Sequence, residues 1–256
     1  IGPFATPTNR EYKKLSPMLG LTYSPASTLS LYASAGRAFA PPSSQVVGEL
    51  EAEKSAQLEF GIKTQAFNGK LTASLAWYQL EKENLAIADS GGLTYHTGSQ
   101  RSRGVEIDVM AQPAQNWQAF IAYAFTDAEF TRFSEDVQIA TASRLKFRRI
   151  DRSGNTPAFV PKHILNLWTN KAFKNGLGIG GGARYISSQF IDEDNAFKID
   201  EAFTLDGMIY YNFGNWRWSF NLKNLADTEY ETRGFGSASV LPGNPFAVYG
   251  AVEFKL

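Results

Sequence analysis

The sequence contains no cysteine and only two histidines, His96 and His163. Without cysteine, the chain cannot form a disulfide scaffold, a thiolate metal site or a cysteine nucleophile. Two histidines cannot build a multi-histidine zinc centre. The Gly-x-Ser-x-Gly motif of many hydrolases is also missing, so we expect no enzymatic activity.

The chain has no excess of charge of either sign, because 25 basic residues balance 25 acidic residues. A protein that binds nucleic acid by neutralising phosphates needs a basic excess, so we expect no nucleic-acid partner. Long apolar runs are missing as well. The uncharged windows 18–36 and 235–252 contain prolines and many polar residues, and neither is apolar enough for a membrane-spanning helix.

The sequence does contain a regular alternation of apolar and polar residues. From Leu71 to Trp77, for example, every second residue is apolar, with threonine, serine and alanine between them. Such alternation predicts β-strands with two different faces. The pattern recurs in about eleven segments of roughly ten residues, which is long for a soluble protein and matches the length that crosses a bilayer at a tilt. These segments begin near Leu19, Leu29, Ala56, Leu71, Val105, Trp117, His163, Leu177, Phe203, Trp216 and Phe246.

The connections between these segments fall into two alternating classes. Short connections rich in Gly, Asn and Pro are expected at residues 25–28, 68–69, 113–116, 175–176 and 214–215. Long polar connections are expected at residues 40–54, 83–99, 127–160, 188–201 and 226–244. Short turns on one side and long loops on the other are typical of an antiparallel β-barrel in an outer membrane.

Aromatic placement agrees with a membrane barrel. Trp117, Trp216 and Trp218 lie close to short turns, whereas Phe125 and Phe203 lie towards long loops. Rings at both membrane edges form the girdles of such barrels. A soluble sandwich or propeller is the alternative, but the chain has no repeat at the propeller period, and sandwiches do not sort their loops so strictly by length. We therefore predict an all-β fold, a transmembrane antiparallel β-barrel.

An odd number of strands is unusual for a bacterial barrel, which closes with an even number. The first predicted strand leads into a short turn, and the last follows a long loop, so both run in the same direction. We expect residues 1–256 to be the C-terminal part of a longer transmembrane β-barrel.

Several segments resemble one family, the TonB-dependent outer-membrane receptors, and in particular its siderophore-receptor branch. The similar segments occur in the family's order, and we expect the resemblance to extend over residues 16–256. They are Ser16–Leu21 with Leu31–Ser34 and Phe39–Pro42, Leu50–Ser55 with Glu59–Lys63, Ser102–Glu106, Asn221–Asp227 with Tyr230, and Pro242–Phe246. Two details depart from the family pattern: Ala52 stands where the family usually has proline, and Leu256 ends the chain where phenylalanine or tryptophan is usual.

The resemblance implies a barrel of about 22 strands, of which these would be the last eleven, and a plug domain in the lumen. The plug and the first barrel strands would lie outside this sequence. The implied partners are TonB-ExbB-ExbD through the plug, lipopolysaccharide and outer-membrane lipid, and the barrel-assembly machinery through the C-terminal strand. The implied activity is uptake of a ferric siderophore across the cell outer membrane.

A siderophore already fills the coordination shell of iron, so its receptor needs aromatic faces, hydrogen-bond donors and cations rather than metal ligands. The resemblance therefore implies no resident cofactor and no metal site. Such side chains occur in the predicted long loops. The candidate ligand-binding residues are Tyr95, His96, Phe190, Arg233 and Phe235.

Charged clusters elsewhere in the chain have simpler interpretations. The basic cluster Arg144, Lys146, Arg148, Arg149 and Arg152 is predicted to face outward from the longest loop and could attract an anionic siderophore or lipopolysaccharide phosphates. Lumen-facing Glu59, Glu106, Asp108 and Asp206 are expected to pair with basic groups of the plug. Asp192, Glu193 and Asp194 lack the spacing and the turn glycine of a calcium loop.

Three functions remain open from the sequence. The preferred one is TonB-energised transport of a ferric siderophore. The second is TonB-dependent uptake of another cargo, such as a corrinoid, haem or an oligosaccharide; paired loop histidines would favour haem, and only His96 falls in a predicted loop. The third is a passive, porin-like barrel.

Overall fold

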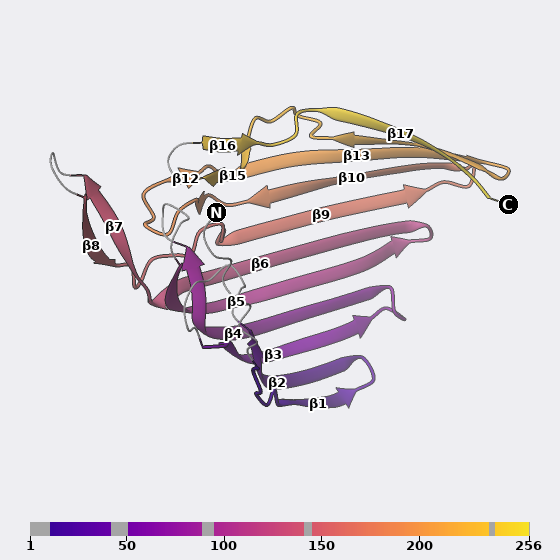
Figure 1. Cartoon of the computed structure of the whole chain (residues 1–256). Coiled ribbons are helices and arrows are strands. Elements are labelled where there is room, and N and C mark those ends of the chain that lie inside the picture. The colour runs from indigo at the N-terminus through magenta and orange to yellow at the C-terminus, as the bar shows by residue number, and fades with distance from the viewer. Residues whose placement is uncertain (1–10, 42–50, 89–94, 141–144, 236–238, 256) are drawn as a thin grey trace.

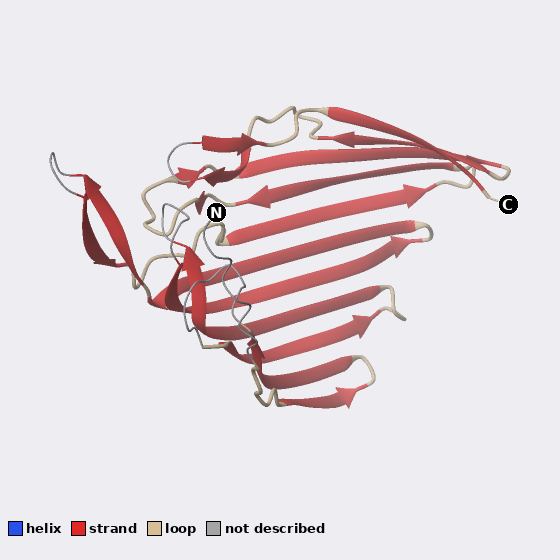
Figure 2. Ribbon diagram, in the orientation of Figure 1, coloured by secondary structure: helices blue, strands red, loops and turns tan. Residues whose placement is uncertain are grey.

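The computed structural model describes residues 11–41, 51–88, 95–140, 145–235 and 239–255. These residues form one curved, antiparallel sheet of eleven strands, together with three small hairpins (Figures 1 and 2). Among the described residues there is no helix of the length and apolarity needed to cross a bilayer. The prediction of an all-β antiparallel fold with eleven long strands is confirmed.

Each strand of the main sheet pairs with the next one along the sheet, and the order is β1-β2-β3-β4-β5-β6-β9-β10-β13-β14-β17. Among the described strands, no pairing closes β17 onto β1, so the sheet has two edges. The strands are β1 (Met18–Ala26), β2 (Leu29–Ala40), β3 (Glu53–Ala66), β4 (Leu71–Ala88), β5 (Tyr95–Ala114), β6 (Trp117–Arg132), β9 (His163–Ala172), β10 (Leu177–Ile186), β13 (Ala202–Phe213), β14 (Trp216–Lys223) and β17 (Ala247–Phe254).

All predicted short turns lie at one end of the sheet, at the right in Figure 1, where β17 also ends. The turn between β3 and β4 contains Asn68 and Gly69 with φ of 57° and 84°, and the turn after β9 contains Gly176 with φ of 90°. Glycine and asparagine tolerate this left-handed conformation better than other residues, which explains the composition of the turns. We call this the short-turn end and the opposite end the long-loop end.

The long-loop end contains strands that the sequence did not predict. The hairpin β7 (Ser134–Ala140) and β8 (Leu145–Asp151) projects beyond the sheet at the left of Figure 1. The pairs β11 (Gln189–Phe190) with β12 (Lys198–Ile199), and β15 (Glu231–Phe235) with β16 (Ser239–Pro242), lie nearer the sheet. The predicted loops at 83–99 and 127–160 are also partly wrong, because β4, β5 and β6 continue into them.

The two faces of the main sheet differ in chemistry, as the alternation predicts. One face, which we call the apolar face, exposes large apolar side chains on most strands, with Leu19 at 76%, Phe203 at 50% and Val252 at 50% exposure. The opposite face, which we call the polar face, presents serine, threonine and charged side chains. An exposed apolar surface of this extent is expected where lipid is the solvent.

Aromatic rings mark both margins of the apolar face. Near the short-turn end, Trp216 packs on Phe254 with ring centroids 4.7 Å apart. Towards the long-loop end, the Tyr123 hydroxyl and His163 Nδ1 are 2.9 Å apart, and the Phe125 ring lies 5.3 Å from the His163 ring. The predicted girdles are therefore present. Phe130, which the sequence also places towards a long loop, is instead 2% exposed and packs on the buried ring of Phe133.

Candidate functional site

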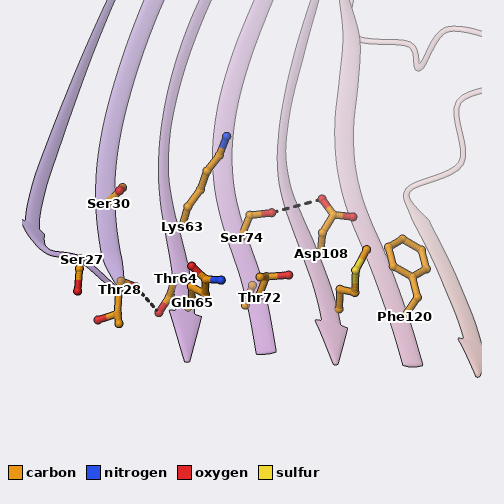
Figure 3. Close-up of a pocket in the computed structure, with 12 residues that line it drawn as sticks. Ser27, Thr28, Ser30, Lys63, Thr64, Gln65, Thr72, Ser74, Asp108 and Phe120 are labelled. Carbon is orange, nitrogen blue, oxygen red and sulfur yellow. Dashed lines mark hydrogen bonds between the residues drawn. The ribbon is translucent and has the colours of Figure 1, made fainter. Parts of the chain in front are cut away.

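The polar face carries a shallow pocket of about 490 Å³ near the short-turn end, across β2 to β6. Figure 3 shows Ser30, Lys63, Ser74 and Asp108 projecting from neighbouring strands along it. Register explains this row, because Ser30 pairs with Lys63, Lys63 with Ser74, and Ser74 with Asp108. The lining is rich in hydroxyl groups, so this part of the polar face can form hydrogen bonds with water.

Acidic residues of the polar face have different partners. Glu59 accepts a hydrogen bond from the Tyr32 hydroxyl at 2.7 Å, and Ser74 donates to Asp108 at 3.5 Å. Asp206 is paired within the sheet, since Lys223 Nζ lies 2.6 Å from its Oδ2. Asp206 therefore does not need the basic partner from the plug that the sequence led us to expect. Glu59, Glu106 and Asp108, in contrast, form no ion pair within the described part of the chain.

Aromatic residues of the polar face lie flat over glycines of the neighbouring strand. A Cβ added at Gly61 would overlap the Tyr32 ring, and one added at Gly178 would overlap the Tyr210 ring. These rings therefore occupy little of the space in front of the sheet. The wall is therefore thin at these two positions, on the side that the barrel resemblance assigns to the lumen.

At the long-loop end, the segment between β8 and β9 is joined to the β11–β12 loop by reciprocal hydrogen bonds. Asn195 Oδ1 accepts from the Thr156 N–H at 2.8 Å, and Asn195 Nδ2 donates to the Thr156 carbonyl at 2.7 Å. Glu193 accepts from the Ala158 N–H at 3.1 Å. Burial raises the pKa of the Glu193 carboxyl, because removal from water disfavours its charged form.

This interlock places Phe159 at the junction of three loops. The Phe159 N–H donates to the Phe190 carbonyl at 2.8 Å, and the Arg233 guanidinium lies 5.2 Å from the Phe159 ring centre. Phe159 has a φ of 61°, which is rare for a bulky residue and needs support from its surroundings. The Lys198 ammonium in turn lies 4.4 Å from the Phe190 ring centre. We call Phe159, Phe190, Lys198 and Arg233 the cation–aromatic cluster.

The structure thus brings together two of the predicted site residues, Phe190 and Arg233. It places Tyr95 and His96 in β5, paired with Ala88 and Ile87, so their predicted position in a loop is wrong. Leu85 to Ala88 supply a β-forming partner segment, which extends the hairpin beyond the predicted strand ends. The backbone of Phe235 pairs with Ser239 at the tip of the β15–β16 hairpin.

Sequence reasoning missed Phe159 and Lys198. The only local signal for Phe159 is an aromatic residue in the short apolar stretch between Pro157 and Pro161. Lys198 follows Phe197 and has no distinguishing pattern. Both residues enter the cluster through contacts that are distant in sequence.

The predicted basic cluster is only partly correct. Lys146, Arg148 and Arg149 are exposed on β8, as predicted, whereas Arg144 lies outside the described residues. Arg152 does not face outward: its side chain is 16% exposed, and its Nη2 lies 2.6 Å from the Glu135 carboxylate, which is 1% exposed. A buried carboxylate requires a partner of opposite charge, and this requirement draws Arg152 inward.

Arg101 and Arg103, just below the predicted loop at 83–99, also have local partners. Arg101 pairs with Glu129, and Arg103 Nη2 lies 3.1 Å from Asp127 Oδ2. These side chains alternate with Ser102 and Gly104 and therefore share the face of Val105 and Ile107 rather than the polar face. They belong to the outer surface of the wall beyond the apolar band.

An antiparallel sheet of membrane-length strands, with an apolar face, two aromatic margins and folded loops at one end only, defines the wall of an outer-membrane β-barrel. Residues 2–225 match the family model described as "TonB dependent receptor-like, beta-barrel". The chain therefore belongs to this family, whose members are transporters rather than enzymes, and its location is the outer membrane.

Curated relatives agree with this assignment. The chain is 30% identical over 264 residues to the ferrichrome outer membrane transporter/phage receptor of Escherichia coli (strain K12), with 98% of this chain and 33% of the relative covered. It is 27% identical over 250 residues to the metal-pseudopaline receptor CntO of Pseudomonas aeruginosa (strain UCBPP-PA14), with 94% and 33% covered. The chain thus spans about a third of the length of these relatives.

Solved structures share the fold. The siderophore receptor PiuA from Acinetobacter baumannii superposes with a TM-score of 0.77 at 22% identity, covering 93% of this chain and 35% of that chain. The ferripyoverdine receptor of Pseudomonas aeruginosa bound to ferripyoverdine superposes with a TM-score of 0.75 at 23% identity, covering 97% and 34%. In both cases the similarity concerns part of the barrel wall.

Proposed function

We propose that this chain forms half of the barrel wall of a receptor that imports a ferric siderophore across the outer membrane with energy supplied through TonB. The observation that carries the proposal is the cation–aromatic cluster at the long-loop end of a wall that belongs to the TonB-dependent receptor family. The relatives named as ferrichrome and metal-pseudopaline receptors support a chelated metal as cargo.

The free edges of the sheet support a larger barrel. All nine residues of β1 are exposed, and an exposed edge strand offers unpaired backbone groups to another strand. In lipid, every backbone polar group needs a partner, so both β1 and β17 require neighbours. A barrel of about 22 strands would supply them.

The polar face supports a plug inside that barrel. Glu59, Glu106 and Asp108 offer carboxylates along β3 and β5, and the flat rings of Tyr32 and Tyr210 leave the lumen clear. Within the proposal, a plug domain from outside these residues fills the lumen and contacts TonB-ExbB-ExbD. The exposed cations of β8 would face lipopolysaccharide, and β17 would be the strand read by the barrel-assembly machinery.

Uptake of radiolabelled iron by the complete gene product tests this proposal. In an iron-starved host without its own receptors, expression should restore uptake of ⁵⁵Fe supplied as ferric siderophore, and deletion of tonB should abolish it. Restored uptake that does not depend on TonB would contradict the proposal.

Liposome swelling distinguishes the proposed plugged receptor from a passive, porin-like barrel. A plugged receptor should not conduct small sugars, whereas a passive barrel should. Rapid swelling by the complete protein would favour the porin-like function. TonB-dependent uptake of a corrinoid, haem or an oligosaccharide, without uptake of any ferric siderophore, would favour the second alternative.

A further inference from the structure

The apolar face carries a shallow pocket of its own near the short-turn end. The pocket measures about 380 Å³ and lies across β6, β9 and β10, which are neighbours in the sheet (Figure 1). Its lining includes Trp117, Thr169, Lys171, Ile179 and Gly181. Register puts these five residues on one face, because Lys171 pairs with both Trp117 and Ile179, and Thr169 pairs with Gly181. The pocket therefore opens towards the bilayer.

Lys171 places a positive charge beside this pocket. Its ammonium nitrogen lies 5.3 Å from the centre of the Trp117 ring and 5.5 Å from the centre of the Phe173 ring. No carboxylate of the described residues forms an ion pair with it. Strand β9 ends at Ala172, so the ammonium lies at the level where interfacial rings meet lipid headgroups. A cation at this level attracts anionic headgroups.

Hydrogen bonds hold the Trp117 ring in place at the side of the pocket. Its Nε1–H donates to Thr169 Oγ1 at 2.8 Å, and the Thr169 hydroxyl donates to the Gln118 carbonyl at 2.9 Å. These two bonds fix the ring against β9. The side of the pocket is thus formed before a ligand arrives, which lowers the entropic cost of binding.

Gly181 gives the pocket its depth. A Cβ added there would meet one atom within 4 Å, the Asp206 carbonyl oxygen at 3.5 Å, which is an ordinary contact. Gly181 is also not among the glycines with positive φ. Neither packing nor backbone conformation therefore requires glycine at this position. A glycine inside a strand often marks a place where another molecule approaches closely.

From this arrangement we infer that the pocket binds one anionic phospholipid of the membrane leaflet at the short-turn end, with its phosphate on Lys171 and an acyl chain over Gly181. Gly181 pairs with Thr169, which lies two residues further from the short-turn end than Lys171, so a chain that descends from the headgroup passes over it. A phospholipid joins a phosphate to a hydrocarbon chain, and the pocket joins a cation to an apolar depression. A zwitterionic lipid carries its own ammonium, which competes with Lys171 for the phosphate.

This inference depends on the membrane barrel and goes beyond the proposed function, because it is independent of the cargo. Native mass spectrometry of the complete receptor in detergent tests it, with phosphatidylglycerol and phosphatidylcholine of identical acyl chains as the probes. One phosphatidylglycerol should bind more tightly than phosphatidylcholine. Lys171→Met should weaken phosphatidylglycerol about fivefold, the effect of one interfacial cation, and should change phosphatidylcholine less than about twofold. Gly181→Leu should weaken both lipids, because the new side chain takes the place of the acyl chain.

Two matched controls separate the site from the membrane surface in general. Lys174→Met removes an exposed cation from the turn after β9. Gly250→Leu adds a side chain to the apolar face at β17, where a Cβ would meet the Phe220 ring at 3.5 Å. Both variants should bind both lipids as the unsubstituted receptor does. Heat-modifiable migration in gels should show that every variant has a folded barrel.

Three results would overturn the inference. The first is equal binding of the two lipids to the unsubstituted receptor. The second is an equal loss of phosphatidylglycerol in Lys171→Met and Lys174→Met, which would mean that the lipid responds only to the total charge of the rim. The third is unchanged lipid binding in Gly181→Leu, which would remove the acyl chain from the pocket. None of these results would alter the test of siderophore uptake.

Discussion

Replacing Arg152 with methionine should release the segment between β8 and β9 from the base of the β7–β8 hairpin. Arg152 Nε and Nη2 both donate to Glu135 Oε1, at 2.8 and 2.6 Å, and the Glu135 side chain is 1% exposed. Methionine preserves most of the side-chain volume but leaves the carboxylate buried without this partner. Breaking a buried ion pair in this way costs about 3–5 kcal/mol.

This cost should appear as local opening, because the pair lies outside the main sheet. The reporters are backbone amides whose acceptors lie across the junction: Arg152 N–H to the Phe133 carbonyl at 2.8 Å, and Gly154 N–H to the Phe130 carbonyl at 2.8 Å. At 1.4 kcal/mol per factor of ten, hydrogen exchange at these amides should accelerate by about a hundredfold or more. Amides of β6 within the membrane should be unaffected.

Two further variants make the result decisive. Arg148→Met removes an exposed cation from the same hairpin and should leave exchange unchanged. Glu135→Leu combined with Arg152→Met removes both charges and should recover most of the protection, since an apolar pair of similar volume replaces the ion pair. The reasoning is refuted if Arg152→Met changes exchange less than about threefold, or if the double variant exchanges as fast as the single one.

Three other perturbations test separate features. Gly178→Ala should lower the heat-modification temperature of the barrel, because the new Cβ overlaps the Tyr210 ring and overpacking costs about 1–3 kcal/mol; Gly20→Ala, which faces open space, is the control. Protection of the Ala158 amide should rise as pH falls through the raised pKa of Glu193, because the folded loop then binds more protons than the unfolded loop, and Glu193→Gln should remove this slope. Trp216→Ala should destabilise the short-turn margin by about 0.5–1.5 kcal/mol or more, because it removes the ring that packs on Phe254; a lower urea midpoint in vesicles measures this loss, and Lys174→Ala in a nearby turn should not cause it.

The wall of the barrel could be predicted from the sequence almost completely. Successive residues of each strand face two different environments in turn, and this period of two can be seen in any short stretch of the sequence. The turns at 68–69 and 175–176 were equally local, since asparagine and glycine supply the positive φ that a tight turn requires. The ends of the strands were less predictable, because β4 and β5 continue beyond the apolar band, where the alternation loses its apolar contrast.

The mouth of the barrel follows a different rule, and this explains why only Phe190 and Arg233 of the cluster were predicted. A lipid-facing side chain is apolar because lipid surrounds it, whatever its neighbours are. Phe159 instead contacts a carbonyl on β11 and a guanidinium on β15, and Lys198 contacts a ring on β11, the strand that pairs with β12. Such contacts leave no periodic trace in the sequence. Because contacts with each other rather than with the membrane position these residues, a substitution in the loops need not disturb the alternation of the wall beneath them.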